Sequence, residues 1–238
     1  MNNSLIIALD FPDKKEVFRF LDGFKGEKLF VKVGMELFYQ EGPNIVRELK
    51  EQGHQVFLDL KLHDIPNTVK SAMRNIAGIG ADLVNVHAAG GIRMMESALE
   101  GLDAGTPAGQ KRPFAIAVTQ LTSTSQEEMQ EWQQIKLPLQ ESVAHYAAIT
   151  KQAGMDGVVC SPLEAAMIRE RIGADFLTVT PGIRLSSDDV QDQVRVATPR
   201  SAKESGVSAI VVGRSITRAL NPYESYQLFK TEWEGVTL

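Results

Sequence analysis

Short runs of apolar, often β-branched residues recur along the chain, and each is followed by a polar or glycine turn. After each turn, apolar residues recur at the spacing of a helix. The pattern predicts strands at 5–10, 29–34, 55–61, 83–87, 114–120, 157–161, 176–180 and 209–213. It predicts helices at 14–21, 43–52, 68–79, 93–102, 139–153, 162–171, 188–204 and 222–230. Glycines precede several strands, as expected where a helix ends before the chain re-enters a sheet: Gly53, Gly80, Gly154 and Gly206.

Eight alternations of strand and helix in a chain of this length indicate an α/β protein, a (β/α)8 TIM barrel rather than an open sheet. The nearly continuous apolar strands agree, because parallel strands are buried on both faces. No linker or composition shift marks a boundary, so we predict one domain over residues 1–238. The longest insertion, 122–138, is polar and is expected to contain a short helix.

Composition narrows the class of protein without changing this fold. The chain is 43% hydrophobic and 23% charged with a formal net charge of −5, as in ordinary soluble enzymes, and no basic stripe suggests a nucleic-acid partner. The single cysteine, Cys160, excludes an internal disulfide and is expected to be a buried, inert thiol in a reducing compartment. No run approaches the about 20 apolar residues of a membrane span. We therefore expect a cytoplasmic protein with no membrane contact.

Active sites in these barrels lie at the C-terminal ends of the strands, so polar residues at those ends are the first candidates for function. A buried ion costs several kcal/mol unless it is paired, and alternating lysines and aspartates at one mouth must therefore neutralise one another. The strand-end residues are Asp10, Lys32, Asp59, Lys61, Asn85, His87, Thr119, Thr122, Pro181-Gly182-Ile183-Arg184 and Gly213-Arg214-Ser215.

Asp59 and Lys61 are two residues apart in the third strand, and both are therefore expected to point toward the barrel mouth. Asp64 follows in the loop, and Pro66 and Thr68 open the next helix. A simpler interpretation is a solvated ion pair followed by a helix cap, and for Asp64 alone that is the better one. Two charges inside a buried strand, with lysine and aspartate on neighbouring strands, favour a catalytic function.

The end of the eighth strand predicts an anion site. Gly213 permits close approach to the backbone, a following short helix would present free N–H groups, and Arg214 supplies a charged fork. Barrels often hold phosphate after strands seven and eight, where Pro181 and Gly182 also lie. A tight turn with an exposed arginine is the alternative.

The sequence offers no other constellation of catalytic residues. His87 has no second histidine or carboxylate at metal-ligand spacing and is interpreted as structural. No Ser-His-Asp arrangement, dinucleotide-binding glycine motif or P-loop is present. We expect neither a metal nor a cofactor.

The strand-end motifs resemble the orotidine 5′-phosphate decarboxylase family, in its bacterial form, and occur in the family's order from Leu5 to about Ala219. The Asp-x-Lys-x-x-Asp element is shared with related sugar-phosphate decarboxylases, whereas the longer version is far more selective. The matching segments are Asp59-Leu60-Lys61-Leu62-His63-Asp64-Ile65-Pro66-Asn67-Thr68, Lys32-Val33-Gly34, Gln120-Leu121-Thr122-Ser123, Thr180-Pro181-Gly182-Ile183-Arg184, Asp192-Gln193 and Val212-Gly213-Arg214.

The resemblance implies decarboxylation of orotidine 5′-phosphate to UMP, with Lys61 as proton donor in a charge network with Lys32, Asp59 and Asp64. It implies a homodimer in which Asp64 and Thr68 reach the partner's site. The implied ligand contacts are Asp10 and Lys32 at the ribose hydroxyls, Thr122 or Ser123 at the pyrimidine, Gln193 between base and phosphate, and Arg184, Gly213 and Arg214 around the phosphate. Asp59, Thr68 and Pro181 are also expected to bind the substrate.

Chemistry supports this activity, because loss of CO2 from C6 leaves a poorly delocalised carbanion that a preorganised ammonium could stabilise and protonate. Remote phosphate binding would have to close loops over the site, which predicts a mobile segment after Pro181. Two rivals stay open. They are a metal-assisted sugar-phosphate decarboxylase or epimerase on the same barrel, and a non-catalytic nucleotide-binding barrel.

Overall fold

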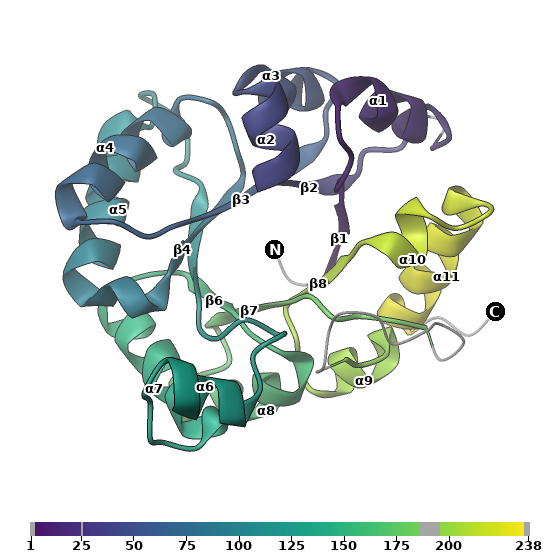
Figure 1. The fold of residues 1–238 in the computed structure, drawn as a ribbon. Coiled ribbons are helices and arrows are strands. Elements are labelled where there is room, and N and C mark those ends of the chain that lie inside the picture. The colour runs from purple at the N-terminus through teal and green to yellow at the C-terminus, as the bar shows by residue number, and fades with distance from the viewer. Residues whose placement is uncertain (1–2, 25, 186–195, 236–238) are drawn as a thin grey trace.

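The structure is a computed structural model of the chain and describes residues 3–24, 26–185 and 196–235. Its strands are β1 (Ser4–Ala8), β2 (Phe30–Gly34), β3 (Gln55–Leu62), β4 (Leu83–His87), β5 (Phe114–Val118), β6 (Gly157–Val159), β7 (Leu177–Thr180) and β8 (Ala209–Val212). All eight pair in parallel and close between β1 and β8, with helices around the outside (Figure 1). The predicted (β/α)8 barrel is confirmed. That all 238 residues form one domain stays a prediction.

The described helices follow the strands in the order expected for this fold. They are α1 (Lys14–Asp22), α2 (Met35–Glu41), α3 (Asn44–Glu51), α4 (Pro66–Ala77), η1 (Ala88–Gly90), α5 (Gly91–Gly105), α6 (Gln126–Trp132), α7 (Leu139–Gln152), α8 (Pro162–Ile172), α9 (Pro199–Glu204), α10 (Arg214–Thr217) and α11 (Pro222–Glu234). The short helix expected in the 122–138 insertion is α6, which begins with a capping box at Ser125.

Several helices differ from the predicted ones. The segment after β2 forms α2, which sequence periodicity missed, and Gly42, with φ +68°, separates it from α3. The helix predicted at 68–79 begins at Pro66, whose fixed φ suits the first turn. Within the described residues, the helix predicted at 188–204 begins only at Pro199, because Thr198 caps it and Ala197 pairs with Ile183. Residues 186–195 lie outside the described residues.

The apolar core has two layers. Alternate strand residues fill the barrel interior, and the opposite set packs under the helices. The interior group consists of Ile6, Ala8, Phe30, Phe57, Leu83, Ile116, Val179, Ala209 and Val211. Lys32, Asp59 and Asn85 each stand two residues beyond an interior residue of this group, on β2, β3 and β4. The same alternation therefore carries polar side chains inward at the C-terminal end.

Polar residues brace the opposite, N-terminal end of the barrel. Asp82 accepts hydrogen bonds from the backbone N–H of Val56, at 2.7 Å, and from the ammonium of Lys50. Asp156 accepts from the N–H of Ala115, also at 2.7 Å, and pairs with the guanidinium of Arg112. Each carboxylate therefore completes the start of the preceding strand.

Candidate active site

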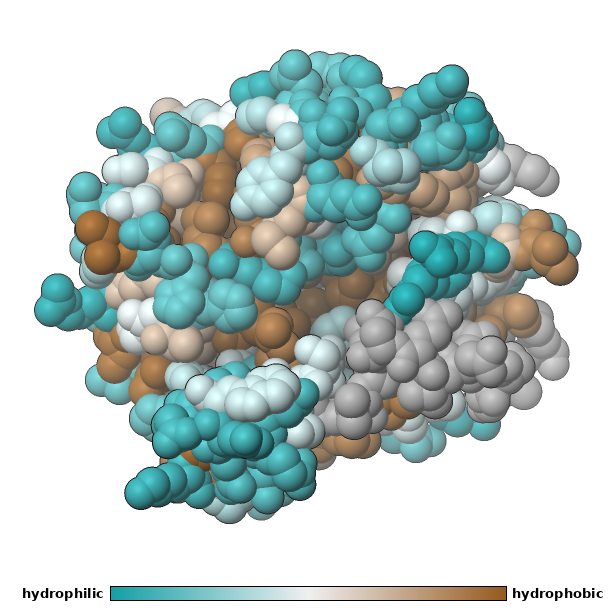
Figure 2. Space-filling view, in the orientation of Figure 1, coloured by the Kyte–Doolittle hydropathy of each residue, from teal (hydrophilic) through white to brown (hydrophobic). Residues whose placement is uncertain are grey.

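A cavity of about 530 Å³ opens at the C-terminal end of the strands. Seen from this face, apolar residues lie in a central hollow that mostly hydrophilic residues surround (Figure 2). Phe57, Val118, Val159, Val179 and Val211 form its apolar wall and floor. The predicted site residues that line it are Asp10, Lys32, Asp59, Lys61, Thr122, Ser123, Pro181, Arg184, Gly213 and Arg214. The fold has thus brought together residues that lie up to 204 positions apart, from Asp10 to Arg214.

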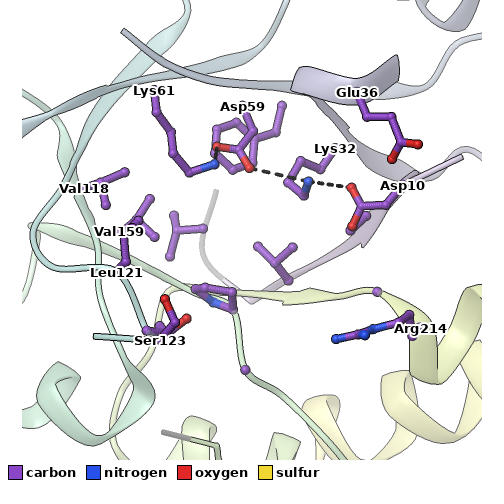
Figure 3. Close-up of a pocket in the computed structure, with 18 of the residues that line it drawn as sticks. Asp10, Lys32, Glu36, Asp59, Lys61, Val118, Leu121, Ser123, Val159 and Arg214 are labelled. Carbon is purple, nitrogen blue, oxygen red and sulfur yellow. Dashed lines mark hydrogen bonds and ion pairs between the residues drawn. The ribbon is translucent and has the colours of Figure 1, made fainter. Parts of the chain in front are cut away.

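Four charged side chains form a row along one side of this cavity (Figure 3). The ammonium of Lys32 lies 3.0 Å from Asp10 and 3.4 Å from Asp59. The other oxygen of Asp59 lies 2.7 Å from the ammonium of Lys61. Asp59 is thus shared by two lysines, whereas the Lys61 ammonium has a single carboxylate partner among the described residues.

The charges hold one another ionised. Burial acts to raise the pKa of Asp59, but the ammoniums of Lys32 and Lys61 and hydrogen bonds from Lys61 and Asn85 outweigh it, so this pKa lies below its ordinary value. Burial conversely acts to lower the pKa of Lys32. Asp59 and Asp10 outweigh that effect, and the net shift is upward. The alternating pattern therefore favours the charged forms of Lys32 and Asp59 beside an apolar cavity.

The backbone at Lys61 departs from a regular strand. Lys61 has φ +52°, in the left-handed region, which costs a non-glycine residue about 1–2 kcal/mol. Between the pairs Leu58–Val84 and Leu62–Val86, β3 advances by four residues and β4 by two, so β3 is bulged here. Asp59 and Lys61 do point to the same place, as predicted, but at a bulge rather than along a regular strand.

Asn85 lies directly opposite this bulge and is 1% exposed. Its amide nitrogen donates to the Asp59 oxygen that also accepts from Lys61, at 2.7 Å, and its amide oxygen accepts from the backbone N–H of Lys61 at 2.8 Å. The sequence had placed Asn85 at a strand end without giving it a role. A buried amide on the interior face of an otherwise apolar strand was the signal available.

The opposite side of the cavity carries the residues predicted for phosphate. Gly182, with φ +83°, and Gly213 bring backbone to the cavity wall, and α10 begins at Arg214 directly after Gly213. Arg214 lies across from the charged row in Figure 3. Arg184 also lines the cavity and is 7% exposed. Two further charged residues line the cavity and were not predicted as site residues, Arg218 and Glu36.

Three predicted residues do not contribute to this cavity within one chain. Asp64 and Thr68 are exposed and do not line it, and the carboxylate of Asp64 accepts from the backbone N–H of Ile65. Their predicted role in a partner's site stays a prediction. Gln193 lies outside the described residues, as does most of the segment after Pro181 for which closure was predicted.

His63 and His87 lie near the charged row rather than in it, whereas Cys160 lies in an apolar cluster of the core. His63 and His87 have ring centroids 5.6 Å apart. Burial, His63 and the Lys61 ammonium all lower the pKa of His87, which favours its neutral form. Cys160 is buried, as predicted. In the part of the chain that the structure describes, no group of three or more His, Cys, Asp and Glu side chains is placed to hold a metal ion.

A search of the described helices finds none with the length and apolar character needed to cross a membrane. Where the protein resides in the cell stays a prediction from its sequence.

The fold and the cavity are those of a (β/α)8-barrel enzyme, whose charged site lies at the C-terminal ends of the strands. Comparison with known proteins gives the family. Residues 3–229 match the family described as "Orotidine 5'-phosphate decarboxylase / HUMPS family", and the chain belongs to it. The resemblance found in the motifs is confirmed.

Individual relatives match over the whole chain. An orotidine 5′-phosphate decarboxylase from Bacillus cytotoxicus is 65% identical over 238 residues, which is 100% of both chains. A solved orotidine 5′-phosphate decarboxylase from Lactobacillus acidophilus is 46% identical with a TM-score of 0.87 and covers 97% of this chain and 98% of its own. An uncharacterised conserved protein from Geobacillus kaustophilus is 61% identical with a TM-score of 0.86, covering 96% and 99% of the two chains.

Proposed function

We propose that this protein decarboxylates orotidine 5′-phosphate to UMP, as a carboxy-lyase of pyrimidine synthesis, and that Lys61 is its proton donor. The observation that carries the proposal is the ammonium of Lys61, held 2.7 Å from Asp59 at the edge of a cavity of about 530 Å³ in a member of this family. Relatives named orotidine 5′-phosphate decarboxylase match the chain along its full length.

The two lysines would have different roles in this reaction. Loss of CO2 leaves an electron pair at C6 of the pyrimidine, and the Lys61 ammonium would stabilise that pair and then donate a proton to it. Asp59 would hold the Lys61 ammonium in position at the cavity. Lys32 is held between Asp10 and Asp59 and is 12% exposed, so it is better placed to bind a ribose hydroxyl together with Asp10 than to give up a proton.

The remaining cavity residues would bind the rest of the nucleotide. Thr122 and Ser123 line the cavity and would bind the pyrimidine edge, and Gln193 is proposed to join base and phosphate. Gly213, Arg214, Arg184 and Pro181 would hold the phosphate, whose binding energy could be used to orient the reacting ring. We therefore also propose that this barrel is of the phosphate-binding type.

One assay separates the proposal from its rivals: absorbance loss of orotidine 5′-phosphate, measured with and without EDTA. We expect turnover that the chelator leaves unchanged. Turnover that EDTA abolishes would favour the metal-assisted sugar-phosphate activity. UMP binding without turnover would favour a non-catalytic nucleotide-binding barrel.

We further propose a homodimer in which Asp64 and Thr68 complete the partner's cavity, with Asp64 extending the charge network. The support is that the segment after β3 lies at the surface, and that it carries Ile65, an apolar residue that is 67% exposed. A covering subunit would remove this side chain from water together with the polar residues on either side of it.

Complementation tests the shared site. Lys61→Ala and Asp64→Ala are each expected to be nearly inactive alone. After subunit exchange, each hybrid dimer would contain one intact site, so about a quarter of all sites in a randomised mixture should recover activity. Exchange verified by mass-tagged subunits without any recovered activity would contradict the shared site.

A further inference from the structure

Asn85 links the two residues at the centre of the proposed chemistry. Its side chain makes two hydrogen bonds, donating to the carboxylate of Asp59 at 2.7 Å and accepting from the backbone N–H of Lys61 at 2.8 Å. It is 1% exposed and does not line the cavity, so it has no direct access to a ligand. Its two bonds therefore act on the residues that do.

The bulge in β3 explains why a side chain is needed there. In a regular parallel ladder, the N–H of Lys61 would pair with a carbonyl of a neighbouring strand. The two extra residues of β3 and the left-handed φ of Lys61, +52°, interrupt the pairing with β4. The amide oxygen of Asn85 takes the place of the missing carbonyl and satisfies the N–H.

The other half of the amide fixes the charge that Lys61 contacts. One oxygen of Asp59 accepts from both the Asn85 amide and the Lys61 ammonium, while its other oxygen lies nearest to Lys32. With Asn85 in place, the carboxylate has one rotational setting that serves all three donors. Without it, the Asp59 carboxylate could rotate and the Lys61 backbone could relax.

We propose that Asn85 is a positioning residue, whose amide fixes the carboxylate of Asp59 and the backbone of Lys61 in one arrangement and thereby aims the Lys61 ammonium into the cavity. This inference rests on the proposed decarboxylation. The alternative is that Asn85 only fills a buried polar position and stabilises the fold.

The first test measures kcat and KM for orotidine 5′-phosphate in Asn85→Leu. Leucine is tolerated on this face, where Leu83 stands two residues earlier. Because misplacement by about 1 Å can cost roughly 100-fold in rate, we expect kcat to fall at least about 100-fold while KM changes less than about fivefold. Thr119→Val is the matched control. Thr119 is also buried at a strand end and makes one side-chain hydrogen bond, to Val159, but lies outside the cavity wall.

Asn85→Asp gives a readout that a purely structural role would not move. The introduced carboxyl can still accept from the N–H of Lys61, but it donates to Asp59 only when protonated. Two adjacent carboxyls share a proton with one raised pKa, so the kcat of Asn85→Asp relative to wild type should recover as the pH falls. A folded Asn85→Leu with kcat within about threefold of wild type would overturn the inference. So would an Asn85→Asp pH profile parallel to that of wild type.

A substrate-independent measurement separates this inference from the proposed function. The ¹³C resonance of the Asp59 carboxyl, assigned with Asp59→Asn, should titrate at higher pH in Asn85→Leu than in wild type and at an unchanged pH in Thr119→Val. If wild type does not turn over orotidine 5′-phosphate, the proposed function fails, and this titration alone decides whether Asn85 controls Asp59. An unchanged Asp59 titration in Asn85→Leu would overturn the inference by itself.

Discussion

Both ends of the barrel carry lysine or arginine paired with aspartate, but the two ends use these pairs differently. At the N-terminal end, each carboxylate accepts from one backbone N–H and one cation, as Asp82 does from Val56 and Lys50. At the C-terminal end, Asp59 accepts from two ammoniums and the Asn85 amide, and from no backbone N–H in the described structure. The first arrangement completes the sheet, whereas the second holds two ammoniums beside a cavity.

The two ends also differ in what the removal of one residue of a charged pair would do to the fold. At the N-terminal end, loss of Asp156 would leave a strand N–H unsatisfied, which is a cost in folding. At the C-terminal end, loss of Lys61 would leave Asp59 still paired with Lys32 and Asn85, so the fold would be little affected. Residues of the same type therefore contribute mainly to stability at one end and, on the proposed function, mainly to reactivity at the other.

The largest expected effect is on Lys61→Ala, which should reduce kcat at least about 10⁴-fold, because loss of a general acid costs up to that factor and electrostatic stabilisation is lost with it. Its free energy of unfolding should stay within about 1 kcal/mol of wild type, since a partly exposed ion pair contributes little. Lys50→Ala at the opposite end is the matched control, with kcat unchanged. Stopped assays and urea denaturation measure both quantities. Substantial activity in Lys61→Ala would show that it is not the donor.

A second prediction concerns the other end and is smaller. Asp156→Ala removes the acceptor of the Ala115 N–H and the bidentate partner of Arg112. We expect the free energy of unfolding to fall by about 2–3 kcal/mol, because a buried N–H without a partner costs about 1–3 kcal/mol. Asp156→Asn keeps an acceptor and should lose less. Because kcat of the folded fraction should be unchanged in both variants, a lowered kcat would contradict the proposed division between the two ends.

The fold and most of the site were predictable because the sequence repeats a simple pattern. Parallel strands buried on both faces require apolar runs, and eight such runs in this length leave little besides a barrel. Charges at the ends of those runs stand out against them, which is why Lys32, Asp59 and Lys61 could be found.

The remainder depends on geometry that the pattern does not contain. The alternation of side chains along a strand correctly predicted that Asp59 and Lys61 point to the same side. It did not predict the bulge in β3 or the left-handed φ of Lys61, because no glycine marks either feature. Asn85 is 26 residues from Asp59, so nothing in the sequence links their hydrogen bond. Helix α2 has only seven residues, too few for a clear helical period.

The smallest expected effect distinguishes the two ends by pH. The pKa of Asp59 is lowered in the folded protein, so the unfolded chain binds more protons between that pKa and the ordinary value of about 3.9. The contribution of Asp59 to stability is therefore fully present above the ordinary value and is lost as the pH falls through the lowered pKa. The stability difference between wild type and Asp59→Asn should shrink over this acid range, as measured by urea denaturation at each pH. The stability difference between wild type and Lys50→Ala should show no change that follows the titration of Asp59. If the difference in free energy of unfolding between wild type and Asp59→Asn does not change with pH, Asp59 is not held ionised by the two lysines. The contrast between the two ends of the barrel would then lose its electrostatic basis.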